Sequence, residues 1–143
     1  MKNISIILFL FTLMLNAQVL TKKDIVPMAA IFYAGCADGF AEGLKYSSVF
    51  AGNKFFDPSI SWCNKYKNGD PAQGEAFPMS TNMLVWTTDA YHWSRMQRNV
   101  AIVTGLTFKV GEKQRWYEYI FEAIAYYLSF CTGFNITYEL MRL

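Results

Sequence analysis

The chain has 143 residues, a formal net charge of +2, and hydrophobic residues at 53% of its positions. This length accommodates one domain, and the high apolar and aromatic content excludes a disordered chain or a flexible linker. The basic residues are few and scattered, so the chain offers no basic surface for phosphates, and we expect no nucleic-acid partner.

The first residues, "MKNISIILFLFTLMLNAQ", have the pattern of a secretory signal peptide. One lysine precedes an apolar run from Ile4 to Leu15, and the polar Asn16 and the small Ala17 follow it. We therefore predict a signal peptide at 1–17, cleaved after Ala17, and an exported protein of the periplasm or membrane. The alternative is an uncleaved anchor helix, for which the run is short, because a bilayer requires about 20 apolar residues.

Residues 18–143 are expected to form a single helical domain with three long helices. The first runs from about Pro27 to Phe50, the second from the capping hydroxyls of Ser80 and Thr81 to about 108, and the third from about 115 to 140. The turn "KVGEKQ" joins the last two, which predicts that they pack antiparallel. The predicted fold is all-α, a small three-helix bundle after a cleaved signal helix.

One long irregular loop, residues 51–80, is expected between the first two helices. It contains three prolines, several glycines and the strong turn sequence "KNGDP". Loops of this length are uncommon in compact domains and are often functional. The loop is rich in aromatic residues, which predicts that it packs on the domain or contacts a protein partner: Phe55, Phe56, Trp62, Tyr66 and Phe77.

The three helices are apolar, but each is interrupted by charged residues, so none has 18 uncharged apolar residues in a row. Two arrangements remain open. The domain is either a soluble exported bundle, or a membrane-embedded one whose polar groups face inward. We favour association with a membrane.

Three glycines spaced by four, Gly35, Gly39 and Gly43, form a narrow stripe on the first helix. Each costs about 1 kcal/mol relative to alanine in a helix, so the stripe predicts close packing against a neighbouring helix. The alternative is that "ADG" within this segment forms a turn and part of it is a loop.

Polar residues share one face of each helix, and we expect these faces to converge. The candidate polar or catalytic cluster comprises Asp38, Glu42, Asp89, His92 and Arg95. Acids buried together need a cation, a proton or water. One solution is a divalent metal that activates water for hydrolysis, with the candidate ligands Asp38, Glu42, Asp89, His92 and Glu122. The other is an ion-pair network or a solvated surface. With one histidine and three cysteines without close spacing, the sequence gives no evidence for a zinc site or a disulfide framework.

The segments "SWCNKYKNGDP" and "TTDAYH", within residues 35–138, resemble small uncharacterised bacterial or phage-encoded exported membrane proteins. The resemblance implies export and a helical, membrane-associated protein, and it carries no known activity. Two functional hypotheses follow. The first is an envelope protein with a structural or interaction role, and the second is a metal-dependent hydrolase at the envelope.

Overall fold

The computed structural model describes residues 22–143. It is all-α, as predicted, and this part of the chain contains no strand, only an isolated bridge between Tyr66 and Glu75. The predicted signal peptide, residues 1–17, lies outside the described residues. The α-helices are α2 (Ile25–Leu44), α3 (Pro58–Ser61), α4 (Ala90–Thr107) and α5 (Trp116–Met141). Short 3₁₀ turns are found at Lys22–Asp24, Trp62–Lys65, Lys67–Gly69, Pro71–Gln73 and Val85–Thr87.

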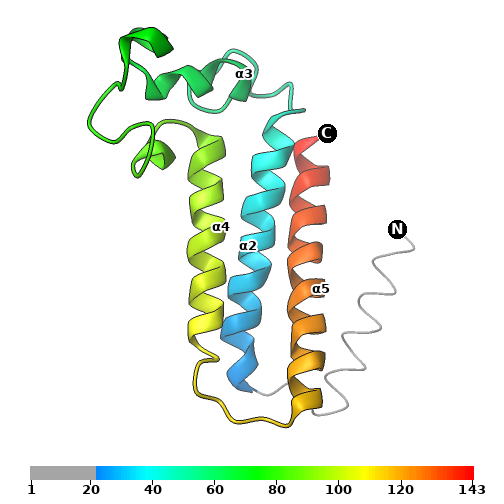
Figure 1. The fold of residues 1–143 in the computed structure, drawn as a ribbon. Coiled ribbons are helices and arrows are strands. Elements are labelled where there is room, and N and C mark those ends of the chain that lie inside the picture. Colours follow the sequence, from blue (N-terminus) through cyan, green and yellow to red (C-terminus); the bar gives the residue numbers. More distant parts are fainter. Residues whose placement is uncertain (1–21) are drawn as a thin grey trace.

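The three long helices lie side by side, with α2 between the other two (Figure 1). α4 runs antiparallel to α2, whereas α5 runs parallel to it. α2 packs extensively against both neighbours, but α4 and α5 make no extended contact with each other. The prediction that the second and third helices pack together is therefore wrong: the connection at 108–115 carries the chain past the end of α2.

Two helix boundaries differ from the predicted ones. α2 ends at Leu44, not near Phe50. α4 begins at Ala90, about ten residues after the predicted cap, because Asp89 has an extended backbone and its side chain accepts a hydrogen bond from the His92 amide. Ser80 is buried and donates its hydroxyl to the Lys65 carbonyl at 2.7 Å. This hydrogen bond joins two parts of the loop, and Ser80 caps no helix.

The glycine stripe of α2 faces α5 at backbone distance. A methyl group on Gly35 or Gly39 would overlap the backbone carbonyl of Phe130 or Phe134, respectively. Gly133 on α5 is equally close to the Phe32 carbonyl of α2. The prediction of close helix packing is confirmed, and the alternative of a turn within this segment is wrong, because the helix is continuous from Ile25 to Leu44.

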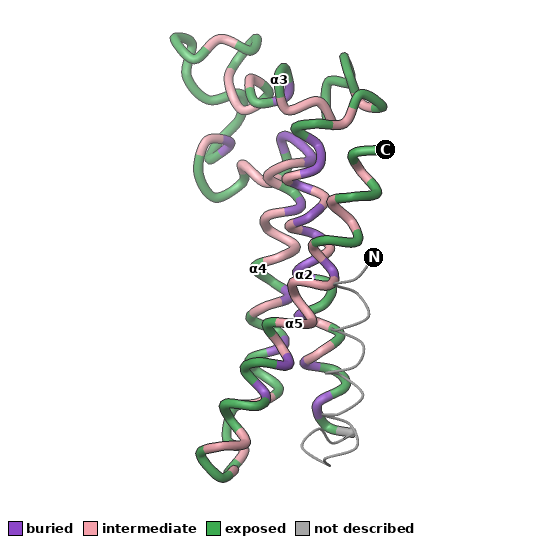
Figure 2. The backbone as a smooth tube through the Cα atoms, turned by 90° about the vertical axis from the view of Figure 1, so that its right-hand side faces the viewer, coloured by how far each residue is buried: buried purple, intermediate pink, exposed green. Residues whose placement is uncertain are grey.

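The interior of the helical layer consists mainly of small residues. Among the buried apolar residues, alanines outnumber the larger Ile31 and Leu44. Large apolar side chains instead lie on the outer surfaces of all three helices. In Figure 2, most buried positions lie along the three helices, and a few lie in the segment between α2 and α4. No helix among residues 22–143 is long and apolar enough to cross a bilayer.

Residues 45–89 form a cap over one end of α2 and α4 (Figure 1). Asn64 ties two parts of the cap together, because its side-chain amide donates to the Lys54 carbonyl at 2.7 Å and to the Thr88 carbonyl at 2.8 Å. The Phe50 ring stacks on Phe56 and also contacts Phe40 of α2. Phe56, at the start of the predicted loop, is thus connected to α2 through Phe50.

Candidate functional site

The Asp89–His92 pair stands where the cap meets α4. Asp89 is 1% exposed and accepts from the His92 backbone amide at 2.8 Å and from the Thr88 hydroxyl at 3.1 Å. The same carboxylate lies 2.6 Å from Nδ1 of the His92 ring. The spacing of three residues at the start of a helix allows one acid to cap the helix and orient the imidazole.

This geometry defines which nitrogen of His92 is available for chemistry. A neutral imidazole bonded in this way carries its proton on Nδ1, so Nε2 is a hydrogen-bond acceptor, and a protonated ring donates from both nitrogens. Nε2 makes no hydrogen bond to any residue in the range 22–143. An acid that fixes the tautomer of a histidine is the arrangement that general bases use.

A second group links α2 to α4 beside this pair. The guanidinium of Arg95 donates to Asp38 at 3.1 Å and to Glu42 at 3.3 Å. Arg98 also donates to Asp38, at 2.8 Å, and Lys45 donates to Glu42 at 2.7 Å. The hydrogen bond to Glu42 raises the pKa of Lys45 above its ordinary value. Both acids of α2 are therefore neutralised by cations.

Tyr91 connects the two groups. Its hydroxyl accepts from Nε and Nη2 of Arg95, at 3.3 Å and 2.9 Å, and its ring packs edge-on against the His92 ring. The Lys45 ammonium lies 5.1 Å from the centre of the Tyr91 ring, within the range of a cation–π interaction. The phenol holds Arg95 in position between the acids of α2.

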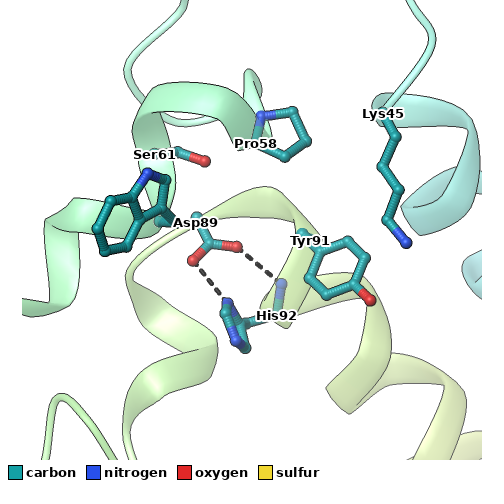
Figure 3. A pocket seen from close by; sticks show the side chains of 7 residues that line it. Lys45, Pro58, Ser61, Asp89, Tyr91 and His92 are labelled. Atoms are coloured by element: carbon teal, nitrogen blue, oxygen red, sulfur yellow. Dashed lines mark hydrogen bonds and ion pairs between the residues drawn. The ribbon is translucent and has the colours of Figure 1, made fainter.

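A hollow of about 210 Å³ lies at this junction. Its walls come from the end of α2, from α3 and the turn after it, and from the start of α4: Lys45, Pro58, Ser61, Trp62, Asp89, Tyr91 and His92. In Figure 3, Lys45 and Ser61 lie on opposite sides, with Tyr91 and His92 below Pro58. Most of the lining is apolar, and the polar groups are few.

All but one of the sequence-predicted residues are thus found in two adjacent groups. Asp38, Glu42 and Arg95 form one ion-pair group, and Asp89 and His92 form the adjacent pair, with Lys45 contacting Glu42 and lining the hollow. Lys45, Ser61 and Trp62 were missed, because only the folded cap brings them to the start of α4.

Glu122, the remaining candidate metal ligand, lies at the opposite end of the helices. There the ammonium of Lys109 is 2.6 Å from Asp24 and 2.9 Å from Glu122, and it also contacts Glu112. Burial alone would lower the pKa of Lys109, but its hydrogen bonds to the three carboxylates outweigh burial and raise it. No sequence pattern indicated this cluster, because Lys109 and Glu112 belong to the connection between α4 and α5.

The five candidate metal ligands do not form one ligand set among the described residues. In residues 22–143, one group of three acids is spaced to hold a cation, namely Asp24, Glu112 and Glu122, whose oxygens lie within 4.8 Å of one another. The Lys109 ammonium contacts all three and supplies the positive charge between them. Of the predicted ligands, this group includes Glu122 alone.

No protein-family model, curated protein or solved structure matches the chain. The interpretation of the site therefore depends on its geometry.

Proposed function

We propose that the protein is an exported, membrane-associated helical protein of the cell envelope, with a structural or interaction role. The observation that carries the proposal is a charge-free apolar belt on the three long helices, which we define as residues 25–37, 99–108 and 123–138. Many of its large side chains are exposed, among them Phe32, Val100, Val103, Leu106, Ile124, Tyr127 and Ile136.

The energetics of this surface favour a lipid environment over water. Each Å² of apolar surface removed from water contributes about 25 cal/mol, and soluble monomers rarely expose contiguous apolar patches above a few hundred Å². The small residues between the helices are also typical of membrane proteins. Helices in membranes associate through glycine and alanine contacts and not through burial of large side chains. The Gly35–Phe130 and Gly39–Phe134 contacts are of this kind.

On α2 and α4, charged groups border the belt at both ends. The Lys109 cluster lies beyond one end, and the group formed by Asp38, Arg95 and Arg98 lies beyond the other. Asp24 and Asp38 are separated by 14 positions along α2, which corresponds to about 21 Å at the rise of an α-helix. An apolar zone between two charged zones fits an interfacial or embedded position better than free solution.

The cap is the part of the chain that we propose for contact with a protein partner. Its own hydrogen bonds hold the cap in shape, among them those that the Thr81 hydroxyl and the Met79 amide donate to Glu75. Trp62 is 46% exposed and Met83 is 70% exposed, and aromatic and methionine side chains are enriched in protein interfaces.

The alternative of a metal-dependent hydrolase has less geometric support. Its acids Asp38 and Glu42 are engaged by Arg95, Arg98 and Lys45, and Asp89 is engaged by His92 and Thr88. A metal at these residues would compete with cations that are already in contact with the same oxygens. The ion-pair network, which was the alternative to a metal site in the sequence analysis, explains how the charges of these residues are balanced.

Flotation on a density gradient with lipid vesicles tests the proposal. The purified chain should float with the vesicles, and the double variant V103K/I124K should float much less, because each added ammonium enters the belt at an exposed position. V49K is the matched control: Val49 is 76% exposed but lies in the cap. Circular dichroism would verify that all three chains are helical. Wild-type protein that stays with the dense fraction, or a double variant that floats normally, would contradict the proposal.

A further inference from the structure

The hollow at the junction contains polar groups that the fold does not use. The Ser61 hydroxyl and Nε2 of His92 make no hydrogen bond within residues 22–143. Lys45 donates one of its three N–H groups to Glu42, and its side chain is 41% exposed. These groups come from three separate segments and line one cavity.

The hydrogen-bond donors around the hollow suit an anion. Asp89 is buried and faces His92 and Thr88, and Glu42 is held by Lys45 and Arg95. The two acids thus have their own donors. Lys45 offers a cationic donor at the wall, Ser61 offers a hydroxyl, and His92 offers a second donor when it is protonated.

The apolar walls and the volume limit the rest of the ligand. Pro58, Trp62 and Tyr91 provide flat apolar surfaces, of which the two aromatic rings can stack on a planar group. A volume of about 210 Å³ is that of roughly seven water molecules in the liquid. It suits a molecule of about ten non-hydrogen atoms, smaller than the ligands of most drug-sized pockets.

We propose that this hollow binds a small organic carboxylate with a flat apolar body. The carboxylate contacts the Lys45 ammonium, and the apolar body lies between Pro58 and the rings of Trp62 and Tyr91. Figure 3 shows Lys45 on one side of the hollow, opposite Ser61, so that a ligand anchored at Lys45 extends toward Ser61 and His92. This inference does not depend on membrane association, since the hollow lies outside the apolar belt.

Binding of benzoate to the full chain tests the proposal, with benzamide as the neutral probe of the same shape. NMR signals of the Trp62 indole and the His92 ring should shift and saturate with benzoate at millimolar concentrations, whereas benzamide should bind about tenfold more weakly. The K45M variant keeps the aliphatic stem but removes the charge, and it should weaken benzoate binding about tenfold. K54M is the matched control, because Lys54 belongs to the cap but does not line the hollow.

Several results would overturn the proposal. One is that neither the Trp62 nor the His92 signal saturates with benzoate. Another is equal binding of benzamide, which would make the hollow a purely apolar site, and a third is an equal loss of affinity in K54M and K45M, which would indicate general charge screening. If K45M fails to fold, the comparison of benzoate with benzamide on the wild-type chain still decides. None of these results bears on vesicle flotation, so the proposed ligand site and the proposed membrane association can be rejected independently of each other.

Discussion

Arg95 on α4 donates to Asp38 on α2 across 3.1 Å, and it donates to Glu42, one helical turn further along α2, across 3.3 Å. One guanidinium thus bridges two like-charged acids that would repel each other on an isolated helix. The bridge also fixes the register of α4 on α2 directly below the cap.

Removing this bridge should destabilise the protein moderately. We expect R95M to lower the free energy of unfolding by about 1 kcal/mol, because the bonds are partly exposed and Asp38 retains its contact with Arg98. Chemical denaturation followed by circular dichroism measures the change. K113M, at an exposed lysine of the connection between α4 and α5, should have no measurable effect; a comparable loss in that variant would indicate a general charge effect and not a specific bridge.

Close packing of α2 and α5 predicts a larger effect at Gly39. We expect G39L to lower the free energy of unfolding by about 3 kcal/mol, because the side chain would enter the space of the Phe134 backbone. The matched control is A29L, at an exposed position of the same helix, which should change stability by less than about 0.5 kcal/mol. Equal melting temperatures for G39L and the wild type would contradict the close approach.

The signal peptide gives a prediction for the mature chain. If residues 1–17 are removed on export, the purified protein should begin at Gln18, and intact-mass spectrometry measures this directly. A chain that retains Met1 in the envelope fraction would favour the anchor helix instead. Replacing Leu8 by arginine should block export, because a charge interrupts the apolar run.

The sequence predicted those features of the fold that depend on local pattern. Apolar content indicated three helices, although the capping hydroxyl predicted at Ser80 misplaced the start of the second. The spacing of Gly35, Gly39 and Gly43 predicted the close contact between α2 and its neighbour. The order of the helices in the layer was not predictable in this way. A short connection indicates that two helices run in opposite directions, but it does not determine whether a third helix lies between them.

The candidate site was also predictable only where it depends on local sequence pattern. The three-residue spacing of Asp89 and His92 brings their side chains together at the start of a helix, so sequence alone indicated the pair. The partners of Asp38 and Glu42 depend on the rotation of α4 about its axis. Lys45 and Ser61 reach the hollow only because the cap folds back over α4, and no periodicity in the sequence indicates that.

The Lys109 cluster supplies the last prediction. Lys109 is the cation between Asp24, Glu112 and Glu122, and its side chain is 12% exposed. We expect K109M to lower the free energy of unfolding by about 3 kcal/mol near neutral pH, because the three acids lose the charge that faces them. The raised pKa of Lys109 means that its contribution in the wild type is fully present below the ordinary lysine pKa and is lost only as the pH rises through the higher folded value.

A second substitution separates electrostatic from packing effects in K109M. In an E122Q background one of the three negative charges is absent, so K109M should lower the free energy of unfolding by less than it does in the wild-type background. The Gln114 amide, which donates to Glu122 at 2.6 Å and to Glu112 at 3.1 Å, can remain as a donor to both side chains in either background. Urea denaturation of the wild type, both single variants and the double variant measures the two differences. Differences of the same size would assign the role of Lys109 to the packing of its aliphatic stem, and a wild type that loses stability between neutral pH and about pH 9 would contradict the raised lysine pKa.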